Sequence, residues 1–366
     1  MGQQGLIPDR IHQPVGAKPR WSQARLTGRQ APMLDSIQYL RAIAAWLVVL
    51  YHVYASLARE TGTAPVFAAG AIGVDIFFVL SGFLMTMVVD RGETMDRRFL
   101  LRRWFRIAPL YYLMTLALFV IALVEPHLLY SATADPLRLL CSVLFLPGSE
   151  ASGGAQPILA LGWTLNYEMA FYLLVFIFVR WGGDNRLFGL MAFLVFLVLL
   201  GQVVDNPGTV LRFYTDPIVL EFAMGIFLYN TIFRRRPSRF SAGVAWLAIL
   251  SGALLFALQI RSEPEAWRFL VWGVPAALIV AGGVHGFTAR IGWLGRLGDW
   301  SYSTYLLHVY VIQAGVKLVL PALGLSSAPP LAVFLLTAPL IALGSFLLFR
   351  GVEMPVMRRF GRSVAR

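Results

Sequence analysis

The sequence contains a single cysteine, Cys141, among its 366 residues. An intrachain disulfide is therefore impossible, and a cysteine-based metal site or redox pair is excluded. Charged residues are also scarce, at 14%, whereas soluble proteins contain about 25%. Hydrophobic residues make up 58% of the chain and the mean hydropathy is +0.69, so the composition predicts a polytopic membrane protein.

Lysine is almost absent, because 29 of the 31 basic residues are arginine. Most of these arginines lie in short segments between apolar runs, which is typical of membrane topology. The net charge of +12 therefore predicts no nucleic-acid partner. Residues 1–33 lack the apolar region of about 7–15 residues that a signal peptide needs. We expect them to form a flexible, basic cytoplasmic tail.

Apolar runs of about 17–25 residues can span a bilayer as helices, and a helical bundle satisfies its own backbone in lipid. We predict an all-α bundle of about ten such spans, forming a membrane domain over residues 34–355 that is followed by a basic cytoplasmic tail, 356–366. With the N-terminus inside, 24 basic residues face the cytoplasm and six face the opposite side, which predicts that both termini are cytoplasmic. The expected spans are 36–57, 71–90, 107–125, 159–179, 187–204, 213–233, 240–258, 268–285, 300–320 and 331–349.

The first span carries two ionisable residues on one face. Arg41 and His52 are eleven residues apart, which is three helical turns plus roughly 20° and about 16 Å along the axis. Such groups cost roughly 2.5–3.5 kcal/mol at the centre of a membrane helix, so we expect them to have a function. The alternatives are an Arg41 that snorkels to the surface and a hydrogen-bonded core histidine. Asp35 and Gln38 match a capping box at the start of this helix.

The second span contains Asp75, four residues inside its outer end and at a depth similar to that of His52. A carboxylate beside an imidazole fixes its tautomer and supports an imidazolium, as a general base requires. We therefore expect Asp75 to orient His52; the alternative is an aspartate that caps a helix at the interface. Gly70, Gly73 and Gly82 predict that neighbouring helices approach this span closely.

A dense group of arginines precedes the third span, in the segment RRFLLRRWFRIAPLYY. Arg102, Arg103 and Arg106 are expected at the inner mouth of the bundle. Such a patch can serve membrane orientation alone, or it can bind phosphates or phospholipid headgroups. Their density favours binding of an anion.

Further polar residues lie within or next to apolar spans. Glu168 and Tyr172 are four residues apart and share one helical face, with Trp163 nearby. A buried glutamate in this setting is hard to explain by packing. In the ninth span, Tyr305 and His308 also share a face, and the alternative there is a core histidine held by the tyrosine.

Asp299 is expected to cap the helix of the ninth span. Glu221, in the sixth span, has fewer polar companions and ranks lower. Together, His52, Asp75, Glu168, Tyr172 and His308 are predicted to face one shared cavity. The chain has no nucleophilic-serine elbow, P-loop or zinc-binding spacing.

These segments together resemble the acyltransferase 3 family of integral membrane acyltransferases, and most closely the branch that acts on bacterial exopolysaccharides. The matching segments are SIQYLRAIAAWLVVLYH, GVDIFFVLSGFL, RRWFRIAPLYY, GWTLNYEMAFY, GDWSYSTYLLH and VEMP, in family order over most of residues 34–355. Arg41 and His52 match the family's essential pair, and Arg103 and Arg106 its Arg-x-x-Arg motif. Asp75, Glu168, Asp299 and His308 fall on other recurrent positions. The opening SIQYLRAIAA departs from the commoner LDGLRGIAA.

The resemblance implies a multi-pass enzyme of the bacterial inner membrane that moves an acyl group, acetyl or succinyl, from cytoplasmic acyl-CoA to a saccharide hydroxyl outside. It implies acetyl-CoA as donor, no metal, and a possible role for polysaccharide-synthesis proteins as partners, since no appended extracytoplasmic domain is expected. In this scheme Arg41, Arg102, Arg103 and Arg106 bind the donor. His52, with Asp75 and Glu168, carries the chemistry, as a base or through an acyl-histidine. Trp163, Tyr172, Asp299, Tyr305 and His308 support the substrates. The competing hypotheses are a flippase for a lipid-linked saccharide and a scaffold protein.

Overall fold

Helices make up the framework of the computed structural model, which describes residues 31–63, 67–93, 95–130, 133–148, 154–234, 241–259, 267–286 and 290–363. Those residues contain no strand. The α-helices are α1 (Ala31–Thr61), α2 (Ile72–Asp90), α3 (Arg97–Val124), α4 (Pro136–Val143), α5 (Gly162–Trp181), α6 (Arg186–Val203), α7 (Thr209–Tyr214), α8 (Leu220–Leu228), α9 (Ala242–Ala257), α10 (Val274–Gly286), α11 (Gly292–Asp299), α12 (Ser301–Ala314), α13 (Leu320–Ala322), α14 (Pro330–Leu348) and α15 (Met354–Ser363).

Eight helices in the described part of the chain are long and apolar enough to cross a membrane. Two shorter apolar helices, Ala242–Ala257 and Phe269–His285, occupy the positions of the seventh and eighth expected spans. Large leucine side chains such as Leu335 and Leu343 on α14 are more than half exposed, which suits contact with lipid. The prediction of an all-α, multi-pass membrane protein is confirmed. The count of ten spans and the cytoplasmic termini stay predictions.

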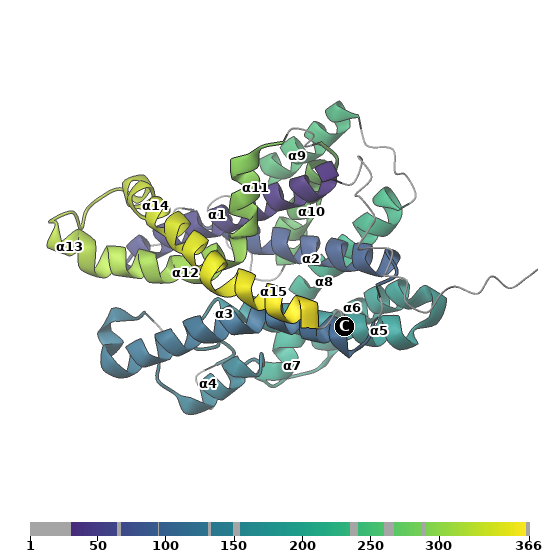
Figure 1. Cartoon of the computed structure of the whole chain (residues 1–366), viewed down its shortest axis with the longest axis horizontal. Helices are drawn as coiled ribbons and strands as arrows, with labels where there is room; N and C mark the ends of the chain where they lie inside the picture. Colours follow the sequence, from purple (N-terminus) through teal and green to yellow (C-terminus); the bar gives the residue numbers. More distant parts are fainter. Residues whose placement is uncertain are drawn as a thin grey trace, which may run out of the picture.

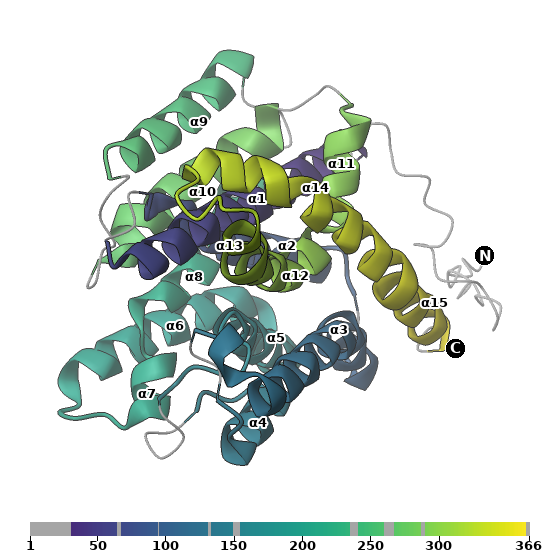
Figure 2. The ribbon, with the colours of Figure 1, turned by 90° about the vertical axis from the view of Figure 1, so that its left-hand side faces the viewer.

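Helices α1 and α2 are the hub of the bundle. Helix α1 packs against α2, α10, α11, α12 and α14, while α2 also packs against α5, α8 and α10. Figures 1 and 2 place α3 to α7 on one side of the molecule and α9, α10, α11 and α14 on the other. Arg41 and His52, on the polar face of α1, are part-exposed within this bundle.

Glycines allow this dense packing around α2, as the sequence predicted. A Cβ atom on Gly73 would lie 2.2 Å from the carbonyl oxygen of Ala44 in α1, and one on Gly82 would lie 2.1 Å from that of Phe222 in α8. Real Cβ atoms do not approach so closely, so any larger residue would push these helices apart. Small residues at such crossings are a common feature of membrane helix packing.

The structure describes the two expected tails to different extents. Residues 1–30 of the predicted tail 1–33 lie outside the described residues, and α1 already begins at Ala31. Asp35 therefore lies inside α1 and is not its N-cap, so the predicted capping box is wrong. The predicted C-terminal tail largely forms α15, which packs against α3 through stacked rings of Phe105 and Phe360, 3.9 Å between centroids.

Candidate functional site

The polar face of α1 lines two separate cavities. One, here called the His52 cavity, has a volume of about 330 Å³ and contains His52, Arg59, Trp163 and Lys317 in its wall. The other, here called the arginine cavity, has a volume of about 180 Å³ and contains Arg41. Arg41 and His52 thus lie on one helical face, as predicted, but they line different cavities.

His52 lines its cavity, and one of its ring nitrogens is bonded to the helix backbone. Its Nδ1 lies 2.9 Å from the carbonyl oxygen of Val48, one turn earlier in α1. Since a carbonyl can only accept, Nδ1 carries the proton and Nε2 keeps its lone pair. The tautomer is therefore fixed by the helix backbone, and Nε2 is the basic atom that a substrate hydroxyl can meet.

His308 supports His52 from behind and does not line either cavity. Its side chain is fully buried, and its ring meets the His52 ring edge to face, with 4.8 Å between centroids. Nδ1 of His308 donates to the carbonyl oxygen of Thr304, at 3.1 Å. The Tyr305 ring contacts the His308 ring, with 6.1 Å between centroids, as the alternative of a core histidine predicts, while the Tyr305 hydroxyl hydrogen-bonds to Thr164, at 2.9 Å.

The arginine cavity gathers three cations that the sequence predicted to act together. Arg41, Arg103 and Arg106 all line it, and Arg103 lies 5.6 Å from the centre of the Tyr172 ring. The Nε atom of Arg103 is buried and has no hydrogen-bond partner among the described residues. A buried guanidinium N–H without a partner is costly, so this cavity is suited to an anionic ligand.

Glu168 also lines the arginine cavity. Its carboxylate accepts hydrogen bonds from the hydroxyl of Tyr172 and, at 3.4 Å, from that of Ser81. The predicted contact between Glu168 and Tyr172 is present. The predicted shared cavity is wrong, however, because Glu168 and Tyr172 lie in one cavity and His52 lies in the other.

Arg102 departs from its expected place among the donor-binding arginines. Its side chain forms an ion pair with Glu93, and it is absent from the wall of the arginine cavity. The reason is helical geometry: Arg102 is adjacent in sequence to Arg103, and successive residues point about 100° apart on a helix. Only one of the two can face the cavity.

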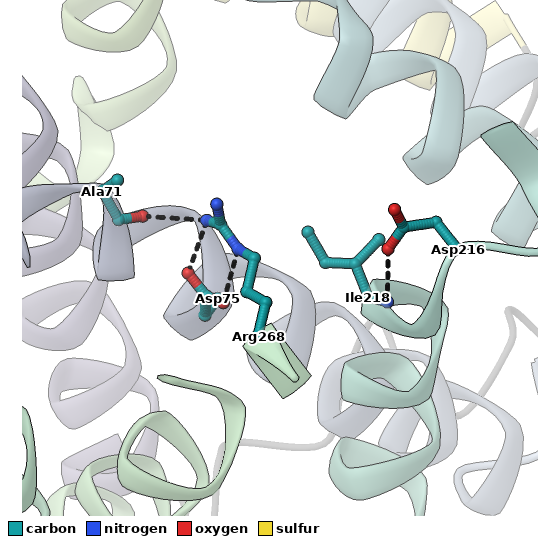
Figure 3. A network of polar contacts seen from close by, with 5 residues as sticks. All are labelled: Ala71, Asp75, Asp216, Ile218 and Arg268. Atoms are coloured by element: carbon teal, nitrogen blue, oxygen red, sulfur yellow. Dashed lines mark hydrogen bonds and ion pairs between the residues drawn. The ribbon is translucent and has the colours of Figure 1, made fainter. Parts of the chain in front are cut away.

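Asp75 has a partner that the sequence did not reveal. Its carboxylate is fully buried and accepts two hydrogen bonds from Arg268, at 3.1 Å from Nε and 2.8 Å from Nη2 (Figure 3). Since Asp75 is committed to Arg268, and His52 is oriented by Val48, the expectation that Asp75 orients His52 is wrong. Two parallel bonds of this kind form the strongest type of ion pair.

Arg268 is the main residue that the sequence interpretation missed. It starts the eighth span and reaches from there into the wall of the His52 cavity, while stacking on Trp272 at 4.7 Å. Glu221 and Asp216 lie close enough to act electrostatically on it. Asp75 itself could have indicated this partner, because a carboxylate inside an apolar span requires a cation. Arg268 was one of the six basic residues expected on the side opposite to the cytoplasm.

Asp299 does not cap the helix of the ninth span as expected. It is the last residue of α11, and Trp300 occupies the N-cap position of α12 without a side-chain cap. Burial raises the pKa of Asp299, and the positive charge of nearby Arg41 opposes that rise. Asp299 therefore lies near the arginine cavity without forming its wall.

The two cavities meet at Tyr305 and Val74, which line both of them. Tyr305 is held there by its hydroxyl, which bonds to Thr164 and lies 3.2 Å from the carbonyl oxygen of Leu161. A long, thin ligand bound by the arginines can thus place its far end near His52 only by passing these two residues. The arrangement therefore places three guanidinium groups in one cavity and the His52 imidazole in the adjoining one.

Comparison with known proteins assigns the family. Residues 34–350 match the acyltransferase domain of the acyltransferase 3 family. The chain is 33% identical over 302 residues to the exopolysaccharide production protein ExoZ of Rhizobium meliloti, covering 80% of this chain and 91% of that protein. It is 29% identical over 368 residues to the acyltransferase MdmB of Streptomyces mycarofaciens, covering 90% and 92%.

A third relative is the peptidoglycan O-acetyltransferase OatA of Listeria monocytogenes, which is 26% identical over 373 residues, covering 91% of this chain and 57% of that protein. No solved structure matches the chain. The match over residues 34–350 shows that the chain belongs to the acyltransferase 3 family of membrane O-acyltransferases.

Proposed function

We propose that this protein transfers an acetyl group from acetyl-CoA, bound in the arginine cavity, to a saccharide hydroxyl bound in the His52 cavity. Support for a saccharide acceptor comes from relatives named for exopolysaccharide production and peptidoglycan O-acetylation. The observation that carries the proposal is the position of the two cavities. The arginine cavity contains Arg103, whose buried Nε has no hydrogen-bond partner among the described residues, and the adjoining cavity contains His52.

The donor fits the arginine cavity by its chemistry. Coenzyme A carries several phosphate groups, and guanidinium groups bind phosphate through charge-assisted, often bidentate hydrogen bonds. Arg41, Arg103 and Arg106 supply these donors. The slender pantetheine arm then extends past Tyr305 and Val74, covering the roughly 16 Å that separates residues 41 and 52 along α1.

His52 performs the proton transfer in this scheme. As the acceptor hydroxyl attacks the thioester carbonyl, Nε2 of His52 takes the hydroxyl proton. The new C–O bond forms and the C–S bond breaks. The proton then passes from His52 to the departing thiolate, so the products are an ester and the free thiol of coenzyme A, and His52 is neutral again.

The direction of transfer follows from the expected topology. If the many arginines of the short loops are cytoplasmic, the arginine cavity opens towards cytoplasmic acyl-CoA and the His52 cavity towards the outer side. The enzyme would then move an acyl group through the bundle and would not need to move the saccharide. This arrangement distinguishes it from a flippase.

The direct test is transfer of radiolabel from acetyl-CoA to saccharide by the purified protein in lipid nanodiscs. Labelled saccharide supports the proposal, and an unlabelled product that is nevertheless moved across a membrane would instead indicate a transporter. The same assay with labelled succinyl-CoA identifies the acyl group, since the proposal expects acetyl to be transferred faster.

Donor binding gives a prediction with a matched control. Arg103→Gln removes a cation from the arginine cavity, so we expect the KM for acetyl-CoA to rise about tenfold or more. Arg102→Gln removes the neighbouring cation, whose ion pair with Glu93 is part-exposed and worth about 0–1 kcal/mol, so its KM should change little. Steady-state kinetics of both variants provides the check. Equal effects in the two variants would contradict the assignment of the donor site.

A further inference from the structure

The wall of the His52 cavity is strongly biased towards positive charge. It contains Arg59, Arg268 and Lys317, and no aspartate or glutamate side chain is part of it among the described residues. Arg268 is already neutralised by Asp75. The cations available to a ligand are therefore Arg59, at the end of α1, and Lys317, in the π-helical turn after α12.

These two cations converge on one aromatic ring. Arg59 lies 5.4 Å and Lys317 4.1 Å from the centre of the Tyr130 ring, and Lys317 also donates to the carbonyl oxygen of His127, at 3.1 Å. Contacts with the ring face hold both charges at the cavity wall. Burial, with the nearby Glu60 carboxylate, raises the pKa of the Tyr130 phenol, so the phenol stays a neutral hydrogen-bond donor.

The rest of the wall suits a sugar. Trp163, Tyr51 and Tyr310 are aromatic residues of the wall, and Gln313 contributes an amide, which is the mixture of apolar and hydrogen-bonding groups typical of small-ligand sites. A volume of about 330 Å³ accommodates a short segment of a saccharide and does not require the whole polymer. Arg59 and Lys317 together outweigh the single negative charge of nearby Glu60, so a net positive charge remains there for an anionic group of a ligand.

We infer that the acceptor is an anionic saccharide, with its negative group held by Arg59 and Lys317 while a hydroxyl of a neighbouring sugar reaches His52. This inference rests on the proposed function for the position of the acceptor. The negative group is a carboxylate of an acidic sugar or a phosphate that links the sugar to a carrier. Both would be bound by charge-assisted hydrogen bonds from the same two side chains.

The test compares three probes that differ in one group: cellobiose, cellobiouronate and cellobiose 1-phosphate. Their dissociation constants for the full-length protein in nanodiscs are measured by calorimetry, and acetyl transfer to each is measured separately. We expect at least one anionic probe to bind about tenfold more tightly than cellobiose, which corresponds to about 1.4 kcal/mol. Preference for the uronate identifies a carboxylate site, and preference for the phosphate identifies a phosphate site.

Charge-removing variants assign the effect to the two residues. The double variant Arg59→Gln/Lys317→Gln should bind the anionic probe and cellobiose with equal affinity. Arg212→Gln, an exposed arginine outside the cavity wall, should keep the wild-type preference. Equal binding of all three probes by the wild type, or a preference that survives in the double variant, overturns the inference.

The binding measurement separates this inference from the proposed function. If the wild type binds the anionic probe preferentially but transfers no acetyl group to any probe, the anionic site stands and the acetyl-transfer proposal loses support. If acetyl reaches cellobiose, cellobiouronate and cellobiose 1-phosphate with equal efficiency and all three bind with equal affinity, the transfer proposal stands and the anionic site is wrong.

Discussion

His52→Ala should abolish acetyl transfer while leaving the protein folded and inserted in the membrane. General-base catalysis typically contributes about 10²–10⁴-fold to the rate, so the rate of acetyl transfer should fall by about 100-fold or more. The fold should survive, because the Nδ1 hydrogen bond of His52 goes only to Val48 in the same helix. Radiolabel transfer from acetyl-CoA and the yield of monodisperse protein in detergent are the two measurements.

A histidine outside the site serves as the control for this variant. His127 lies on the surface, where it pairs with Glu125, and its side chain is 73% exposed. His127→Ala should therefore retain nearly wild-type transfer. A His52→Ala protein that acetylates normally would show that the catalytic assignment is wrong, and loss of insertion in that variant would show a structural role instead.

The second large effect concerns stability and the pair between Asp75 and Arg268. Arg268→Gln removes the cation and leaves the fully buried Asp75 carboxylate without its positive partner. Breaking a buried ion pair costs about 3–5 kcal/mol, so the Tm in a fixed detergent should fall markedly. Asp75→Asn should cost less, since Arg268 is part-exposed in the wall of the His52 cavity and can keep its charge there.

A double variant and a surface pair complete this experiment. Asp75→Asn/Arg268→Gln removes both charges and should recover part of the stability lost in Arg268→Gln. The pair of Arg234 and Asp90 is largely exposed, so Arg234→Gln should change stability by about 1 kcal/mol or less. A double variant less stable than Arg268→Gln, or an equal loss in Arg234→Gln, would argue against a buried structural pair.

Hydropathy predicted the elements of this fold well, because spans in lipid must be helical and apolar over a fixed length. The expected span 71–90 corresponds to α2, Ile72–Asp90, within one residue at its start. Helix ends were less predictable. Asp35 and Asp299 both have the chemistry of an N-cap, yet α1 begins four residues before the first and α12 begins two residues after the second.

The sequence predicted contacts of the site within one helix but not those between helices. Helical periodicity correctly placed Arg41 and His52 on one face of α1 and correctly predicted the contact between Glu168 and Tyr172, because both depend on positions within one helix. The pair of Asp75 and Arg268 joins residues 193 positions apart, and periodicity carries no information at that range. The division into two cavities likewise depends on how Tyr305 and Val74 pack between helices, which composition and spacing do not specify.

We propose that the acyl group enters at the arginine cavity and leaves at the His52 cavity, on opposite faces of the membrane. Proteoliposomes with saccharide acceptor sealed inside and labelled acetyl-CoA added outside test it most directly. We expect labelled acceptor inside the vesicles with the wild type and none with His52→Ala. Label that appears only when donor and acceptor share one side of the membrane would contradict it.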